Sequence, residues 1–311
     1  MAKFINPFTD IGFKRIFGQE VSKPILVKFL NCLLDGERTI TDLKLLDKEQ
    51  PGESADNKSL IYDVYCEVDG GEHIIVEMQY KSQSFFKNRC VYYLARSIST
   101  QGDPGKEWNY SDVKAVYIVA LMNFKMSSLG DEFRTDVGLM DMHRKELFSD
   151  KMRLVFLQMP CFTKSVEECE TLFDKLIYVL KNMEVLKRMP WLAQDAVFQK
   201  LASVADVASL SKREREIYDE NLRKFRDTVA VMEGQWLEGH ASGLAEGMEK
   251  GMEKGMEKGM EKGVEKGMEK GMEKGVDKAN RENARRMKAD GMPAELIAKY
   301  TGLTIEAVNS L

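Results

Sequence analysis

The segment Leu60–Lys81, LIYDVYCEVDGGEHIIVEMQYK, predicts a β-hairpin. Two runs rich in β-branched residues flank the triplet DGG at 69–71, which is a strong turn signal. Side chains alternate between the two faces of a strand, so the polar residues of each run share a face. They are Asp63 and Glu67 on the first strand, and Glu77, Gln79 and Lys81 on the second.

The register of this hairpin decides whether Asp63 and Glu77 meet. If the turn is centred on Gly70, residues whose numbers sum to 140 stand opposite each other, and Asp63 faces Glu77. A two-residue loop would place the two carboxylates on opposite faces of the sheet. We therefore predict a loop of odd length, of three or five residues.

Two carboxylates on neighbouring strands repel each other, and folds usually avoid this pairing. The pairing becomes favourable if a divalent cation lies between Asp63 and Glu77, because hard cations such as Mg²⁺ bind carboxylate oxygens. The alternative is an ordinary solvated hairpin face with scattered charges. The pattern by itself leaves both interpretations open.

Four sequence features in this order resemble one branch of a known superfamily. They are NPFTDIGFKRIFG (6–18), IVEMQ (75–79) in the hairpin, FFKNRCVYYLARS (85–97) and a repeat with glycine at every fourth position. Together they resemble the Rpn family of recombination-promoting nucleases, also described as transposases, in the PD-(D/E)XK nuclease superfamily. The resemblance covers residues 4–162 and the architecture of the C-terminal part.

This resemblance implies an α/β fold with a PD-(D/E)XK restriction-endonuclease-like core and a mixed sheet. It implies that Asp63 and Glu77 bind Mg²⁺, or Mn²⁺, with the Met78 carbonyl as a third ligand. Gln79 stands where most of the superfamily has lysine, and an amide cannot carry positive charge. The remaining candidates around the site are Lys81 and Arg89 as replacements for that lysine, and Asp10, which either reaches the site through water or caps the first helix.

Composition is typical of a globular protein: 311 residues, 43% hydrophobic and 31% charged. No apolar run approaches the roughly 20 residues that span a bilayer, and the N-terminus lacks an apolar signal core, so we expect a cytoplasmic protein. The five cysteines form no C-x-x-C pair, which argues against a disulfide framework or a zinc site. A net charge of −4 argues against tight, independent DNA binding but allows a locally basic cleft.

The sequence divides into a nuclease-like domain (1–162), a helical region (163–238), a repeat (239–278) and a small helical tail (279–311). In the first domain we expect helices at 11–17, 23–34 and 85–99 and further strands at 40–46, 113–122 and 151–158. Capping boxes at Ser165–Glu168 and Ser211–Glu214 are expected to open helices in the second region. The sequence does not decide whether that region is a lid or a dimer element.

The repeat, mostly Gly-Met-Glu-Lys, has glycine at every fourth position ten times between Gly239 and Lys278. Each glycine costs about 1 kcal/mol of helix stability relative to alanine. Against this, Lys250 and Glu253 have i,i+3 spacing, and small residues every four positions let helices approach closely. The segment is either a helical stalk that self-associates with right-handed winding or a tandem-duplicated linker.

The tail reads as short helices. Pro293 starts one, Gly302 makes a turn and Thr304 caps the next, which resembles a helix-turn-helix. The last helix carries no lysine or arginine, so it is poorly suited to bind phosphates. A small interaction motif fits as well as DNA binding.

Two functions follow. The first is a metal-dependent DNA endonuclease of low sequence specificity that promotes DNA recombination or mobile-element movement by phosphodiester hydrolysis. Asp63 and Glu77 would hold the metal, with Gln79 and Lys81 or Arg89 beside them. The alternative is a catalytically lapsed nuclease fold that acts as a binding or assembly module through its repeat region. In either case a homo-oligomer through the helical region and the repeat is a further expectation.

Overall fold

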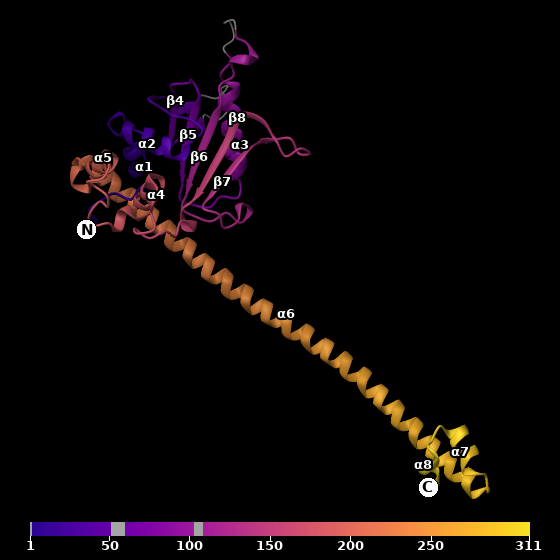
Figure 1. The fold of residues 1–311 in the computed structure, drawn as a ribbon. Coiled ribbons are helices and arrows are strands. Elements are labelled where there is room, and N and C mark those ends of the chain that lie inside the picture. Colours follow the sequence, from indigo (N-terminus) through magenta and orange to yellow (C-terminus); the bar gives the residue numbers. More distant parts are fainter. Residues whose placement is uncertain (1, 51–59, 103–107) are drawn as a thin grey trace, which may run out of the picture. The chain divides into compact units, whose positions relative to one another are not determined.

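The computed structural model describes residues 2–50, 60–102 and 108–311 (Figure 1). The chain forms two compact units, one ending at Met232 and one spanning Glu233–Leu311. Within the described residues, the first unit contains a six-stranded sheet in the order β1-β4-β5-β6-β8-β7. The strands are β1 (Leu43–Leu45), β4 (Val64–Val68), β5 (His73–Gln79), β6 (Val116–Met122), β7 (Arg134–Met140) and β8 (Leu147–Gln158), and β2 (Glu49–Gln50) pairs separately with β3 (Leu60–Ile61).

The sheet is mixed, as expected. β5, β6 and β8 are parallel, whereas β1, β4 and β7 pair antiparallel with their neighbours. β6 has all seven residues buried, as its uninterrupted apolar sequence predicts for a strand covered on both faces. The helices of the unit are α1 (Asp10–Phe17), α2 (Lys23–Leu33), α3 (Phe86–Ser99), α4 (Leu172–Asn182), α5 (Ala196–Ala205) and the start of α6 (Lys212–Ala289).

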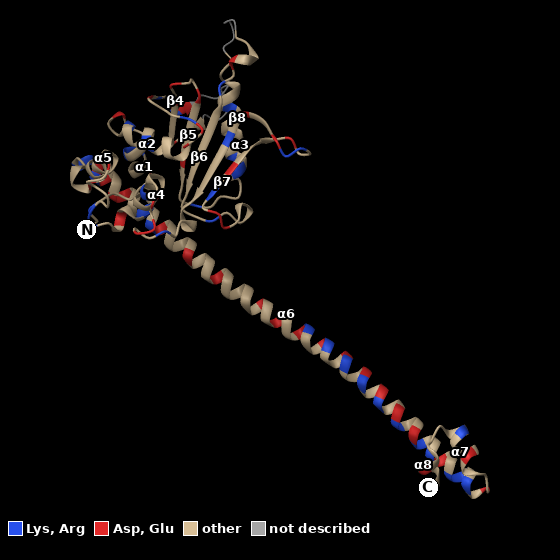
Figure 2. Cartoon of the chain, in the orientation of Figure 1, with Lys and Arg blue, Asp and Glu red and all other residues tan. Residues whose placement is uncertain are grey.

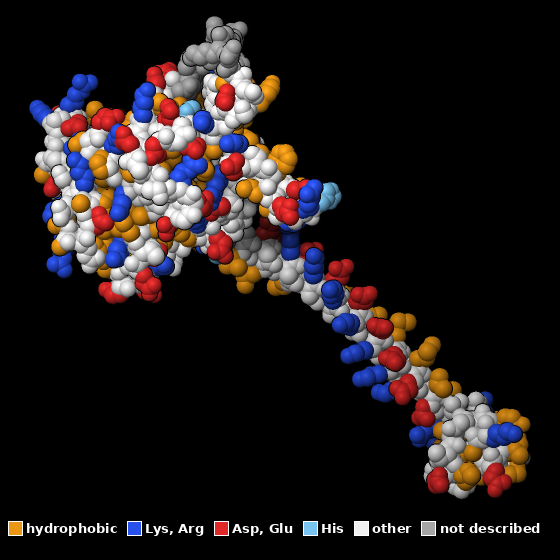
Figure 3. Space-filling model, turned by 45° about the horizontal axis from the view of Figure 1, so that its top comes forward, with side chains coloured by type: hydrophobic (Ala, Val, Ile, Leu, Met, Phe, Trp, Pro, Cys, Tyr) orange, Lys and Arg blue, Asp and Glu red, His pale blue; other side chains and the backbone are white. Residues whose placement is uncertain are grey.

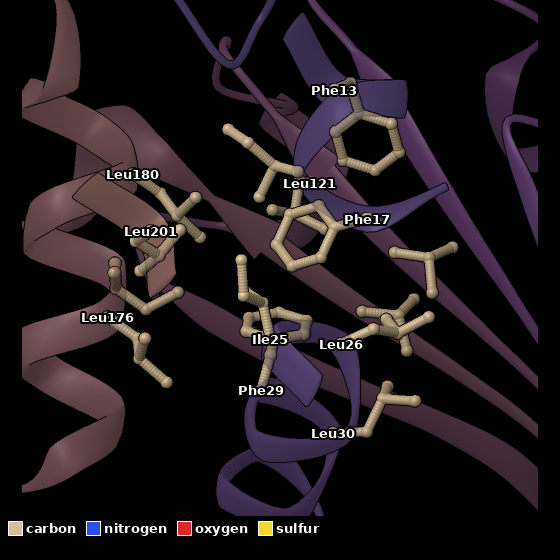
Figure 4. Packing of buried hydrophobic residues seen from close by; sticks show 14 of the residues in the cluster. Phe13, Phe17, Ile25, Leu26, Phe29, Leu30, Leu121, Leu176, Leu180 and Leu201 are labelled. Carbon is tan, nitrogen blue, oxygen red and sulfur yellow. The ribbon is translucent and has the colours of Figure 1, made fainter. Parts of the chain in front are cut away.

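The two faces of the sheet have separate cores. On one face Ile74, Val76 and Met78 of β5 share a cluster with α1, α2, α4 and α5. Figure 4 shows Phe17 of α1 and Leu121 of β6 within this cluster. On the other face Ile75 packs with residues of α3. Since α4 and α5 contribute fully buried residues, this part of the helical region belongs to the core that supports the sheet.

The predicted hairpin register is confirmed. Val64 pairs with Val76 and Glu67 with His73, so opposing residue numbers sum to 140. Val68 N–H donates to the Glu72 carbonyl at 2.9 Å, which leaves a three-residue loop, 69–71. Gly71 has φ of +79°, a left-handed conformation that glycine adopts without strain. The turn therefore fixes the odd loop length on which the meeting of Asp63 and Glu77 depends.

Several elements differ from the sequence predictions. β7 was not predicted, and β8 begins at Leu147 instead of 151, because the exposed hairpin between them lacks a clear alternating pattern. The Ser165–Glu168 box forms a hydrogen bond but does not open a helix, since α4 starts later with Thr171 as its N-cap. Glu214, in contrast, accepts from Ser211 N–H at 2.8 Å at the start of α6, as predicted.

The second unit contains the rest of α6, α7 (Ala294–Thr301) and α8 (Ile305–Ser310). The whole repeat lies within α6. Lys250 pairs with Glu246 at i,i+4, not with Glu253 as the sequence suggested, because glutamate preceding lysine by four residues is the favoured helical arrangement. Ala284, Ile297 and Val308 are fully buried in a small core that joins the end of α6 to α7 and α8.

Candidate active site

Asp63 and Glu77 meet at the end of the hairpin opposite its turn. The β4–β5 ladder ends at the pair Val64–Val76, and Asp63 and Glu77 are the next residues in the same register. Asp63 Oδ2 accepts a hydrogen bond from Met78 N–H at 2.8 Å, and Asp63 N–H donates to Glu77 Oε1 at 3.3 Å. The structure thus brings together the two carboxylates that the sequence predicted as metal ligands.

Both carboxylates are held in a poorly solvated place. Glu77 is 4% exposed. Burial, and then the neighbouring Asp63 carboxylate, raise the pKa of Glu77 to about 8, although Arg89 opposes this rise. Burial also raises the pKa of Asp63, against the hydrogen bond from Met78 N–H. Two acids held this close together in a buried place are typical of a site that binds a cation or shares a proton.

Gln79 and Arg89 contact each other beside Glu77. Arg89 Nη2 donates to Gln79 Oε1 at 2.6 Å and lies 3.8 Å from Glu77 Oε2. Its guanidinium also lies over the rings of Phe86 and Tyr93, at 5.0 and 5.8 Å from their centroids. α3 therefore supplies a fixed positive charge beside the buried Glu77. Arg89 Nε is buried and, among the described residues, has no hydrogen-bond partner.

Lys81 takes a different position. Its backbone carbonyl accepts from Gln79 Nε2 at 2.9 Å, while the residue itself is exposed beyond the end of β5. In the described part of the chain its side chain makes no ion pair. Of the two residues considered as replacements for the missing lysine, Arg89 is the one in contact with Gln79 and Glu77.

Two residues of α1, Asp10 and Lys14, affect the site electrostatically. Asp10 does not cap α1, because Thr9 is the N-cap and accepts from Gly12 N–H. Asp10 instead pairs with Lys14 at 2.5 Å. Lys14 and Asp10 both act electrostatically on Asp63, Lys14 lowering and Asp10 raising its pKa. Sequence reasoning missed Lys14, although its i,i+4 spacing from Asp10 puts both on one face of the helix.

The donor set suits a hard divalent cation. Carboxylate oxygens are the ligands that Mg²⁺ and Mn²⁺ prefer, and Mg²⁺ needs only one or two protein carboxylates besides water and phosphate oxygens. Within residues 2–50, 60–102 and 108–311 no group of three or more His, Cys, Asp or Glu side chains is suited to a metal. Asp63 and Glu77 would therefore hold such an ion as a pair of carboxylates.

Comparison with known protein families matches residues 7–235 to the PD-(D/E)XK nuclease family transposase. The chain belongs to this family. The sequence predicts that Asp63, Glu77 and Gln79 stand at the places of the family's two acids and its lysine, and this assignment stays a prediction. Comparisons with curated proteins and with solved structures find no match.

The family assignment accounts for the mixed α/β core and for its acidic hairpin. It supports a nuclease or transposase type of function, the use of divalent metal and an interaction with DNA. Wherever the structure describes the chain, each helix is either too short or too polar to cross a bilayer.

Proposed function

We propose that this chain is a metal-dependent DNA endonuclease that hydrolyses phosphodiester bonds with little sequence preference. The observation that carries the proposal is the contact between Asp63 and Glu77 across the hairpin. Glu77 is almost fully buried, and the hydrogen bonds of Asp63 to Met78 N–H and Glu77 fix the geometry of the pair. Burying two acids together is costly, and it is useful in a site that binds a cation.

In this proposal Asp63 and Glu77 hold Mg²⁺ or Mn²⁺, with the Met78 carbonyl as a third ligand. The ion, when bound, lowers the pKa of a coordinated water and neutralises charge on the scissile phosphate. Arg89 stabilises negative charge that develops on the phosphate, and Gln79 holds the guanidinium in place through its 2.6 Å hydrogen bond. Lys81 and Lys14 contribute positive charge at the rim of the site.

The cellular role in this proposal is DNA recombination or movement of a mobile element, and the compartment is the cytoplasm. The net charge of −4 makes the protein a weak DNA binder outside the site, which is consistent with low sequence preference. Positive charge concentrated at Arg89 and Lys14, together with the bound cation, attracts the phosphate backbone locally.

Cleavage of supercoiled plasmid DNA tests the proposal. Wild-type protein with Mg²⁺ or Mn²⁺ is compared with Asp63→Ala and Glu77→Ala, and with Glu67→Gln as a matched control. Glu67 is an acid on the same hairpin, but it pairs with His73 near the turn. We expect nicking or linearisation by the wild type and by Glu67→Gln, and none by the two alanine variants. Equal cleavage by all four proteins would reveal a contaminating nuclease and refute the assignment.

A catalytically lapsed relative is the second candidate, because Gln79 replaces the family lysine. In that case the protein would act as a binding or assembly module through its repeat region. The discriminating measurement is calorimetric binding of Mn²⁺ by wild type and Glu77→Ala, with circular dichroism to show that both are folded. Metal binding that depends on Glu77, combined with no cleavage of single- or double-stranded DNA, would favour the lapsed module.

A further inference from the structure

One side of α3 carries a stripe in which aromatic and arginine side chains alternate. Its members are Phe85, Arg89, Tyr92 and Arg96, separated by four, three and four residues. On a helix of 3.6 residues per turn these positions fall within about 60° of one another around the axis. Arg89 N–H donates to the Phe85 carbonyl at 3.0 Å, so the helical hydrogen bonding already includes Phe85. We call these four residues the α3 stripe.

The two aromatic rings of the α3 stripe lie on the surface. The opposite side of the helix packs on the sheet through buried residues such as Phe86, Cys90 and Leu94. Phe85, in contrast, is 56% exposed and Tyr92 is 58% exposed, and neither belongs to either core of the sheet. Large apolar groups that are exposed together, next to a functional site, indicate a binding surface.

The charge of this segment has one sign. Residues 80–102 contain four basic residues and no acidic one, in a chain whose net charge is −4. In Figure 2 α3 carries basic residues, in blue, and no acidic residue, in red. On the face of the first unit that Figure 3 displays, basic and acidic side chains are interspersed. The segregated positive charge along α3 is complementary to an anionic partner.

The α3 stripe begins at the candidate active site. Arg89 Nη2 lies 3.8 Å from Glu77 Oε2 and donates to Gln79 Oε1 at 2.6 Å. The positions from 85 to 96 span about 16 Å along the helix axis. A DNA strand with a phosphate at the acidic pair therefore has aromatic and basic side chains beside it on α3.

We propose that the α3 stripe binds single-stranded DNA, with unpaired bases stacked on Phe85 and Tyr92 and phosphates held by the arginines. This inference rests on the proposed function, because it takes DNA as the substrate. It adds the form of DNA that the site accepts, which is a strand with unpaired bases close to the phosphate that is cleaved.

The chemistry of the α3 stripe favours unpaired bases over a duplex. Within a duplex both faces of a base are covered by its neighbours, so an exposed ring can stack only on a base that is unpaired or at an end. Stacking on aromatic rings tolerates any base, which agrees with little sequence preference. The guanidinium of arginine suits phosphate oxygens. A stripe of about 16 Å matches roughly five nucleotides at 3.4 Å each.

Fluorescence anisotropy with labelled oligonucleotides tests the proposal. The full chain is titrated in EDTA, where no metal-dependent cleavage occurs, against a single strand of 16 nucleotides and a blunt duplex of the same sequence. We expect the single strand to bind at least tenfold more tightly. Phe85→Ala and Tyr92→Ala should each weaken its binding by about 5- to 100-fold, the usual loss when a base–aromatic stack is removed. Equal affinity for both DNA forms, or no loss in either variant, would overturn the proposal.

Matched controls separate stacking from general effects of surface substitution. Tyr92→Phe keeps the ring and should bind within about twofold of the wild type. Val91→Ala removes a 54% exposed apolar side chain from the same helix but about 100° away from Tyr92, and Phe148→Ala removes a 79% exposed ring from β8. Both should bind as the wild type does, and circular dichroism should show every variant folded. A loss in these controls equal to that in Tyr92→Ala would refute the assignment to the α3 stripe.

Photo-cross-linking locates the bases directly. A single strand that carries 5-bromodeoxyuridine is irradiated with the wild-type protein, and mass spectrometry identifies the linked residues. We expect links to Phe85 or Tyr92, whereas links confined to other elements would refute the platform. A single-stranded RNA of the same sequence is titrated in parallel, and tighter binding of RNA would overturn the assignment to DNA.

The outcomes for the α3 stripe and for the nuclease are distinguishable. Binding of single strands that depends on Phe85 and Tyr92, without cleavage in Mg²⁺ or Mn²⁺, would support the α3 stripe and refute the nuclease. Metal-dependent cleavage that is equally fast in the wild type and in Phe85→Ala/Tyr92→Ala, on tailed and blunt DNA alike, would support the nuclease and refute the α3 stripe.

Discussion

Arg89 donates a hydrogen bond of 2.6 Å to Gln79 Oε1, and this contact brings its guanidinium to 3.8 Å from the buried Glu77. The amide at position 79 thus positions a cation that belongs to the next helix. This relationship lets the site carry positive charge although the strand has no lysine at that place.

Removing this cation is expected to impair cleavage. In plasmid assays Arg89→Ala should lower the rate by about 10²- to 10³-fold, the usual loss when one group that stabilises developing charge is removed. Lys81→Ala should stay within about threefold of the wild type, because the Lys81 side chain is exposed and outside the contact network.

Arg89→Lys is the useful companion variant. It keeps the positive charge but loses the planar guanidinium, which donates hydrogen bonds to both Gln79 and Gln83. We expect partial activity from it. If Lys81→Ala abolishes cleavage while Arg89→Ala does not, the assignment of the charge to Arg89 is wrong.

Glu77→Gln is expected to raise the free energy of unfolding and to abolish cleavage. Burial raises the pKa of Glu77 from 4.5 to about 8, so without metal the charged carboxylate destabilises the fold increasingly as pH rises from about 4.5 to 8. In EDTA at pH 8, urea denaturation should show Glu77→Gln to be more stable than the wild type by up to about 5 kcal/mol, because the pKa of Glu77 rises from 4.5 to about 8 and each pKa unit is worth about 1.4 kcal/mol. Cleavage should be lost. Lower stability of Glu77→Gln at pH 8 would contradict the burial argument.

His73 is expected to make the fold sensitive to mild acid. Tyr65 Oη lies 2.8 Å from His73 Nδ1, and burial lowers the pKa of His73 below 6.5, although Glu67 opposes this. The unfolded chain therefore takes up this proton first, and stability is lost as pH falls through 6.5. Denaturation curves at pH 8 and pH 5.5 should show a smaller acid-induced loss in His73→Gln than in the wild type. An equal loss in both proteins would remove His73 as the cause.

Gly71 should be sensitive to substitution because of its backbone conformation. Its φ of +79° disfavours any residue with a Cβ, so Gly71→Ala is expected to lower the free energy of unfolding by about 1–2 kcal/mol. Gly71→Asn should cost less, since asparagine tolerates the left-handed region. Thermal or urea unfolding measures both. Equal stability of all three proteins would show that the turn relaxes without cost.

The sequence by itself determined the local features of this protein. Strand alternation and the DGG turn were enough to predict the odd loop and the pairing of Asp63 with Glu77, because register in a short hairpin is a local property. The buried strand ending at Met122 and the helix carrying Arg89 were also evident, since their apolar spacing is regular. The family followed from motifs in fixed order and is shown for residues 7–235.

Tertiary structure alone decided what depends on distant segments. The hydrogen bond between Arg89 and Gln79 depends on how α3 packs on one face of the sheet. The electrostatic effect of Lys14 on Asp63 depends on how α1 packs on the other face. Neither relationship can be read from the neighbouring sequence. The burial that raises the pKa of Glu77 likewise comes from that packing. β7 was missed because its stability comes from pairing along β8 and not from its own pattern, so a strand with mostly exposed residues left little signal in the sequence.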